Sequence, residues 1–295
     1  MAKAGTGKRT KTKKKGLKGK QILQALVMAL LIIGCVKFCE ALDNLDNGQH
    51  EALARDEVGN LMRVKTNQAL KSVEKRYKGM DVSFNPQYHI PNWVSWELTE
   101  EETSGDVART NKFLADPDVE GCAESWDYNY SGYDRGHMAP AGDMKWDKDA
   151  MAETFYMTNI CPQVKSLNTG TWKRLEEKCR YWAEIDGSLY IVCGPVIDGD
   201  PVEYIGDSRV YVPKRFFKVI LSPYSNPARG IGFIIPNGKV KGGMQECAVP
   251  IDSVEALTGH DFFSSLPDDI ENDVESQCNF HYWSTLRKNK KLTDE

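Results

Sequence analysis

The chain has 295 residues, with 38 Lys and Arg against 42 Asp and Glu, a formal net charge of −4. Nine of the basic residues lie within residues 1–20, so the remainder carries 29 basic and 42 acidic side chains, a balance of about −13. Because attraction to phosphate dominates non-specific binding of nucleic acids, this balance excludes a protein that binds them over its whole surface.

The amino terminus combines a basic tail, residues 1–20, with an apolar segment, residues 21–42. The uncharged run Gln21–Val36 is rich in Leu, Ile, Val and Met, which is typical of an export signal or a membrane anchor. Its sixteen residues, at about 1.5 Å each in a helix, fall short of a hydrocarbon core of roughly 30 Å, so a cleaved signal and a short anchor both remain open. Ile32–Cys35 also resembles the cleavage box of bacterial lipoproteins, in which Cys35 becomes the lipidated first residue.

Topology follows from the same segment. Basic residues before an apolar run stay inside, so we expect the chain beyond Leu42 to be extracytoplasmic, either tethered to the membrane through this segment or secreted. The lysine tract has two competing interpretations, a nucleic-acid-binding arm and a mitochondrial address. The adjoining apolar run favours the topological interpretation.

The rest of the chain divides into three parts. Residues 43–78 are polar, with scattered Leu and no Pro, and predict a partly helical stalk or linker. Residues 79–286 predict one domain of about two hundred residues, within the usual size for a single core. A charged tail, 287–295, ends the chain.

Within the large domain, apolar runs punctuated by Gly and Pro predict sheet strands. These runs are rich in Val, Ile, Phe and Tyr and lie at residues 189–196, 209–213, 216–221 and 230–235. Helices are predicted from Thr169 onward and within 252–258. The expected fold class is therefore α+β.

The most informative stretch is Tyr133–Pro140, which contains Asp-Arg-Gly-His and is followed by Asn159–Gln163 and Asn168. From Thr169 to Trp182, apolar residues recur at steps of three and four, which predicts an amphipathic helix that begins next to Asn168. A strand, a loop and this helix would place His137 opposite Asn168, Glu176 and Arg180 across a narrow cleft. A histidine beside an arginine, with an amide and a carboxylate opposite, supplies the parts that phosphodiester hydrolysis needs.

This ordered set resembles the DNA/RNA non-specific endonuclease family, the ββα-metal nucleases that include secreted bacterial nucleases and mitochondrial endonuclease G. The resemblance runs from about Tyr88 to Trp283. It implies a central antiparallel sheet flanked by helices with a ββα-metal catalytic motif. It also implies a metal-dependent endonuclease that hydrolyses DNA, RNA or both and leaves 5′-phosphate ends.

The resemblance also implies roles at the centre of the site. His137 is expected to be the general base, a task that suits an imidazole titrating near neutrality. Asn168 matches the one protein side chain that ligates the metal, Mg²⁺ or Mn²⁺ in its place, with waters and phosphate oxygens completing the shell. Glu176 matches the acidic residue that holds water at the metal. Asn159 matches a polar active-site residue whose role stays open.

Three arginines complete the implied set. Arg135 and Arg180 match phosphate-binding arginines, whose planar guanidinium engages two oxygens at once. Arg109 is a looser match to a substrate-contacting arginine. Given the acidic body, we expect basic residues to gather in the cleft, from Arg109, Arg135, Lys165, Lys173 and Arg180; otherwise the enzyme binds substrate weakly and relies on turnover.

Simpler interpretations compete with these roles. Asn168 at a helix start is typical of an N-cap, and Glu176 with Arg180 is typical of a surface ion pair one turn apart. At the level of function, the alternatives are a catalytically silent nucleic-acid-binding protein and a phosphodiesterase of small substrates on the same fold. The sequence predicts no oligomeric state.

Cysteine usage points away from zinc. The eight cysteines contain no Cys-x-x-Cys pair, and Cys161 is expected to be a buried small side chain. Export would permit disulfides, and Cys247 with Cys278 is the predicted pair.

Overall fold

The computed structural model describes Leu53 and residues 59–287. The chain divides into two compact units, Met1–Gln49 and His50–Glu295, and the first lies outside the described residues. The predicted basic tail, the apolar segment and Cys35 therefore lie outside the described residues. So do residues 43–58 of the predicted stalk, except Leu53, and the tail from residue 288. None of the described helices has the length and hydropathy that a membrane crossing requires.

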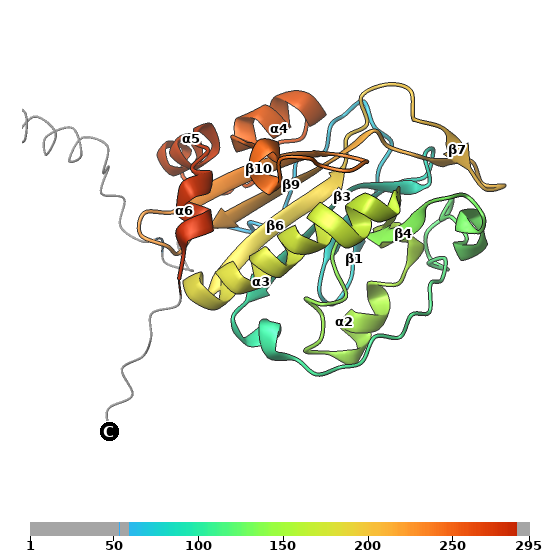
Figure 1. Ribbon diagram of the computed structural model, residues 1–295, viewed down its shortest axis with the longest axis horizontal. Coiled ribbons are helices and arrows are strands. Elements are labelled where there is room, and N and C mark those ends of the chain that lie inside the picture. Colours follow the sequence, from blue (N-terminus) through green and yellow to red (C-terminus); the bar gives the residue numbers. More distant parts are fainter. Residues whose placement is uncertain (1–52, 54–58, 288–295) are drawn as a thin grey trace, which may run out of the picture. The chain divides into compact units, whose positions relative to one another are not determined.

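A seven-stranded antiparallel sheet forms the centre of the described unit (Figure 1). Its strands, in spatial order, are β1 (Val73–Arg76), β2 (Asp81–Asn85), β3 (Ile90–Thr99), β6 (Ser188–Pro195), β9 (Arg215–Ser222), β10 (Arg229–Pro236) and β11 (Ala248–Val249). Two-stranded pairs join β4 (Asp134–His137) to β5 (Ile160–Gln163) and β7 (Tyr204–Ile205) to β8 (Val210–Tyr211). The predicted α+β class with a central antiparallel sheet is confirmed.

The sheet is covered on both faces, which explains why its central strands are almost continuously apolar. Alternate residues of β6 enter different cores: Ile191 and Cys193 join one hydrophobic cluster, and Val192 joins another. Helix α3 (Lys173–Asp186) packs on the first face, while α4 (Ile251–Thr258) and α5 (Asp268–Ser276) pack on the second, as Figure 1 shows. Two shorter α-helices, α2 (Lys148–Glu153) and α6 (Phe280–Thr285), complete the set of α-helices in the described residues.

The predicted strands agree best with the observed ones in the second half of the described unit. The runs at 189–196, 216–221 and 230–235 correspond to β6, β9 and β10, whereas the run at 209–213 contributes only the two residues of β8. Strand β1 lies before Gly79, so the sheet extends into the predicted stalk. Strands β1, β2 and β3 were not predicted.

The helix predicted from Thr169 begins differently. Residues Leu167–Trp172 form a turn of π-helix, interrupted at Gly170, whose φ of −107° and ψ of −112° are not helical; regular α-helix begins at Lys173. The predicted disulfide is wrong. Cys247 is buried with a free thiol, and Cys278 is free and exposed beyond α5.

Candidate active site

A pocket of about 330 Å³ lies where strand β4 meets the start of α3. Six of the predicted site residues line it together: Arg109, Arg135, His137, Asn168, Glu176 and Arg180. The remaining lining residues are Asn111, Phe113, Pro140, Ala141, Gly142, Thr169 and Lys173. The structure therefore brings together residues that span more than seventy positions of the chain.

The β4–β5 pair fixes the position of His137. Antiparallel register sets His137 opposite Ile160 and Gly136 opposite Cys161. A Cβ atom at Gly136 would lie 2.3 Å from Gln163 Oε1, so glycine there lets the buried Gln163 side chain keep its position. The indole Nε1 of Trp172 donates to the carbonyl oxygen of His137 at 3.0 Å and thereby ties the start of α3 to the end of β4.

The imidazole of His137 lies in an aromatic environment. Its ring contacts Phe155 edge-on, with centroids 4.9 Å apart, and Phe113 at 5.5 Å. Its Nε2 atom is buried and has no hydrogen-bond partner among the described residues. Burial, reinforced by the charge of Arg109, lowers the pKa of His137 to about 3. The expectation that this imidazole titrates near neutrality is therefore wrong. Burial keeps the ring neutral near pH 7, the form that can accept a proton.

Asn168 is oriented by an acidic neighbour. Its Nδ2 donates to Asp134 Oδ2 at 2.9 Å, and its side chain makes no N-cap hydrogen bond. Since a carboxylate accepts but does not donate, the amide nitrogen must face Asp134. The amide oxygen of Asn168 is thus the end left for another ligand.

Glu176 lies among several charges. Burial raises its pKa to about 7, with Asp143 acting in the same direction and the cations of Lys218, Arg180 and Arg109 opposing it. No ion pair within 4 Å joins it to Arg180 in the described part of the chain. The interpretation as a surface pair one turn apart is therefore wrong.

Arg180 pairs instead with Asp143. Its Nη1 donates to Asp143 Oδ1 at 2.7 Å, and the carboxylate side chain is fully buried. Trp96 Nε1 donates to the other carboxylate oxygen at 3.1 Å. A Cβ at Gly142 would lie 2.8 Å from Arg180 Nη1, so glycine there leaves room for the guanidinium.

The other two arginines, Arg135 and Arg109, make no ion pair within 4 Å in the described part of the chain. Arg135 donates from Nε to the carbonyl oxygen of Ser125 at 3.0 Å and from Nη2 to Asn129 Oδ1 at 2.7 Å. Arg109 is exposed, and its guanidinium lies over the ring of Phe155, 5.2 Å from the centroid.

Asn159 does not line the pocket. Its Nδ2 donates to the carbonyl oxygens of Ala139 and Thr154, and its Oδ1 accepts from the amide of Ala139, each at 2.9 Å. The side chain is fully buried. Its geometry supports a role in holding the loop after His137 rather than contact with substrate.

Lys218 is a functional candidate that the sequence analysis missed. It is fully buried on the α3 face of β9, with its Nζ 4.5 Å from the ring centroid of Trp172 and 4.8 Å from that of Trp96. Its Nζ has no hydrogen-bond partner among the described residues, and it lowers the pKa of both Glu176 and Asp143. The available signal was a lysine inside the otherwise apolar run of β9.

Positive charge gathers in the pocket as expected. Arg109, Arg135, Lys173 and Arg180 line it with Glu176 as the one acid, whereas Lys165 is exposed outside it. Such a cluster focuses attraction for an anion within a body that is acidic overall.

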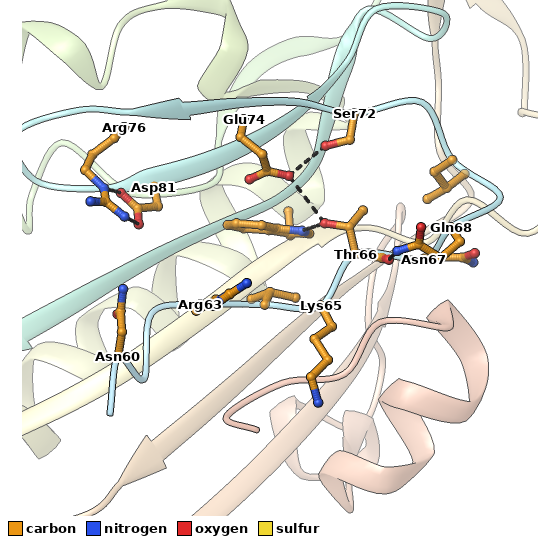
Figure 2. Close-up of a pocket in the computed structure, with 13 residues that line it drawn as sticks. Asn60, Arg63, Lys65, Thr66, Asn67, Gln68, Ser72, Glu74, Arg76 and Asp81 are labelled. Carbon is orange, nitrogen blue, oxygen red and sulfur yellow. Dashed lines mark hydrogen bonds and ion pairs between the residues drawn. The ribbon is translucent and has the colours of Figure 1, made fainter. Parts of the chain in front are cut away.

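A larger groove of about 810 Å³ lies elsewhere, and Figure 2 shows its lining. Several of its polar groups pair with one another: Arg76 with Asp81, and Glu74 with Ser72 and Thr66. It has no histidine. This groove does not offer the base that the smaller pocket provides.

Comparison with known proteins identifies the family to which the chain belongs. The DNA/RNA non-specific endonuclease family matches residues 57–269. Mitochondrial nuclease EXOG of Mus musculus is 36% identical over 222 residues, covering 69% of this chain and 60% of that protein. The mitochondrial nuclease of Saccharomyces cerevisiae is 36% identical over 210 residues, covering 62% of this chain and 63% of its own length. The chain thus matches less than two thirds of either relative.

A solved structure extends the similarity to the fold. In the crystal structure of the EndoG/EndoGI complex, the similar chain superposes with a TM-score of 0.63 and 28% sequence identity. The match covers 67% of this chain and 88% of that one.

The predicted location is wrong. An extracytoplasmic protein, tethered or secreted, was expected from residues 1–42, but the similar nucleases of mouse and yeast are mitochondrial. Their names give no support to a membrane tether. A basic tract before an apolar run is compatible with more than one destination, and composition alone did not separate them.

Proposed function

Because the chain belongs to the DNA/RNA non-specific endonuclease family, we propose that it is a metal-dependent nuclease that hydrolyses phosphodiester bonds of DNA and RNA. One observation carries the proposal: the neutral imidazole of His137 and the Asp134-held amide of Asn168 line the same pocket, among four basic side chains. The expected products carry 5′-phosphate ends.

The donor set fits a hard divalent cation. The amide oxygen of Asn168 has no hydrogen-bond partner among the described residues, and the carboxylate of Glu176 lines the same pocket. Oxygen ligands of this kind suit Mg²⁺, or Mn²⁺ in its place, and water and phosphate oxygens would complete the shell. When bound, the ion stabilises negative charge on the reacting phosphate and on the leaving 3′ oxygen.

The protein side chains supply the remaining steps. His137 takes the proton of the attacking water, since its ring is neutral and the buried aromatic wall of Phe113 and Phe155 holds it in place. Glu176 accepts hydrogen bonds from water in the pocket and so orients it. Arg180, fixed by Asp143, and Arg135, fixed by Ser125, hold the phosphate through their remaining N–H groups. Arg109 contacts the substrate from the rim.

Cleavage of unrelated polymers tests this proposal. The full chain is incubated with supercoiled plasmid and with a structured RNA, in MgCl₂ or EDTA, beside His137→Ala. Degradation of both polymers to ladders with 5′-phosphate ends, lost in EDTA and in the variant, is expected. Discrete fragments, or cleavage of small diesters alone, would support a site-specific nuclease or a small-substrate phosphodiesterase. Binding without cleavage would support a catalytically silent protein.

A further inference from the structure

Three carboxylates converge on the sheet face that lies opposite α3. Asp252 and Glu255 lie one turn apart on α4, and Glu275 lies near the end of α5; Figure 1 shows these two helices side by side. One oxygen from each residue lies within 4.8 Å of the others. We propose that Asp252, Glu255 and Glu275 form a second divalent-cation site, selective for Ca²⁺, that joins α4 to α5.

The buried member of the group makes this more than a cluster of surface acids. Glu275 is only 6% exposed, and its Oε1 has no hydrogen-bond partner among the described residues. A buried carboxylate oxygen is costly unless a hydrogen bond, a counter-ion or a metal satisfies it. Since Glu275 belongs to a group of converging carboxylates, a cation is the ligand that would satisfy all three residues together.

Glu255 is fixed in advance. The backbone amide of Phe262 donates to Glu255 Oε1 at 2.7 Å, which holds the side chain in place. Asp252 is exposed at the edge of the group, so water can reach the site. The arrangement thus has one buried ligand, one oriented ligand and one at the solvent boundary.

Neighbouring charge increases the need for a cation. Besides burial, four carboxylates raise the pKa of Glu275 to about 9: Glu255, Glu271, Asp252 and Asp261. The nearby cation of Lys65 is paired with Asp261, Nζ to Oδ2 at 2.8 Å. A proton on Glu275 would offset one negative charge of this group, whereas a divalent cation would offset two.

The ligand set favours Ca²⁺ over Mg²⁺. Calcium accepts several protein carboxylates in a flexible geometry, at about 2.3–2.6 Å from each oxygen. Magnesium demands near-ideal octahedral geometry at about 2.0–2.1 Å and loses its water reluctantly, so three carboxylates from two helices suit it less. The group has no histidine or cysteine, which argues against zinc.

Calcium titration of the full chain tests the proposal. Asn168→Ala is the common background, so that the proposed nuclease site does not contribute. Isothermal titration with CaCl₂ is expected to show one ion per chain, and CaCl₂ is expected to raise the melting temperature relative to EDTA. Asp252→Asn and Glu275→Gln should each weaken binding at least about tenfold, because each removes a charged ligand. Asp268→Asn, at an exposed acid of α5 that is not among those raising the pKa of Glu275, is the matched control and should bind as the parent does.

Three results would overturn the proposal. The first is a folded parent that neither binds Ca²⁺ nor gains thermal stability from it. The second is Ca²⁺ binding that both Asp252→Asn and Glu275→Gln retain in full, which would locate the ion elsewhere. The third is a parent whose stability does not respond to Ca²⁺, together with a Glu275→Gln variant that is more stable than this parent in EDTA. That result would show that Glu275 stays protonated and binds no cation. Asp252 is exposed, so Asp252→Asn should fold even if Glu275→Gln does not.

Discussion

Asp134 accepts a hydrogen bond from the side-chain amide of Asn168, with 2.9 Å between Oδ2 and Nδ2. The bond joins strand β4 to the π-helical turn before α3, and it leaves the amide oxygen of Asn168 available in the pocket. An acidic residue of the Asp-Arg-Gly-His stretch thereby determines which end of Asn168 faces the pocket, where the proposed cation would bind.

Removing the hydrogen bond from Asn168 to Asp134 should weaken metal binding. Asp134→Ala is expected to lower the apparent affinity for Mg²⁺ in the cleavage reaction by about 10–100-fold, as loss of a partner that orients a ligand commonly does. Asp134→Asn keeps an oxygen that can accept from Asn168 and should retain most of the affinity. Activity measured against MgCl₂ concentration provides the comparison. Equal affinity in Asp134→Ala and wild type would show that Asp134 does not orient the ligand.

The ionised carboxylate of Glu176 should destabilise the folded protein. Its pKa is raised from 4.5 to about 7, so the folded state holds this proton more tightly than the unfolded state does, and stability falls as pH rises through that range. In EDTA, Glu176→Gln should therefore be more stable than wild type above pH 7, by an amount on the order of 3 kcal/mol, and equal to it below pH 4.5. Urea unfolding at several pH values measures this, and a difference independent of pH would contradict it. The variant should also lose cleavage activity.

The buried cation of Lys218 should assist ionisation of Glu176. Lys218→Met keeps the length of the side chain and removes the charge, so the pKa of Glu176 should rise further and half-maximal activity should move to higher pH. The pH profile of kcat/KM measures the shift. Lys214→Met, an exposed lysine just before the same strand, is the control and should leave the profile unchanged. A Lys218→Met profile identical to wild type would exclude this electrostatic role.

Substrate binding should depend strongly on salt. Because four basic side chains line the pocket, log kcat/KM should fall steeply and linearly with log salt concentration. Arg109→Ala, which removes an exposed cation without breaking a buried ion pair, should reduce the slope by about one. Equal rates at low and high salt would contradict binding focused on the pocket.

Much of the site was predictable because its members lie close in sequence on a strand, a turn and a helix. One ββα unit contains His137, Asn168, Glu176 and Arg180. The lengths of its strands, turn and helix bring these side chains close together in space. Lys218 comes from a distant strand, where only the packing of Trp96 and Trp172 over it reveals its role.

Other features depended on tertiary contacts that no local pattern encodes. The sequence around Asn159 does not show whether its side-chain amide faces the pocket or, as here, the backbone of Ala139 and Thr154. Arg180 has an acid one turn away in Glu176, yet its partner is Asp143, which lies 37 positions earlier. The pairing of two cysteines likewise depends on positions in space, and Cys247 and Cys278 are both free.

The central claim is that the amide oxygen of Asn168 holds the cation that cleavage requires. The most direct measurement is plasmid cleavage by the full chain and by Asn168→Ala across a range of MgCl₂ concentrations, with circular dichroism to confirm that both are folded. We predict that Asn168→Ala loses at least about a hundredfold in rate at Mg²⁺ concentrations that saturate wild type. A folded Asn168→Ala protein that cleaves at the wild-type rate with the same Mg²⁺ dependence would contradict the account.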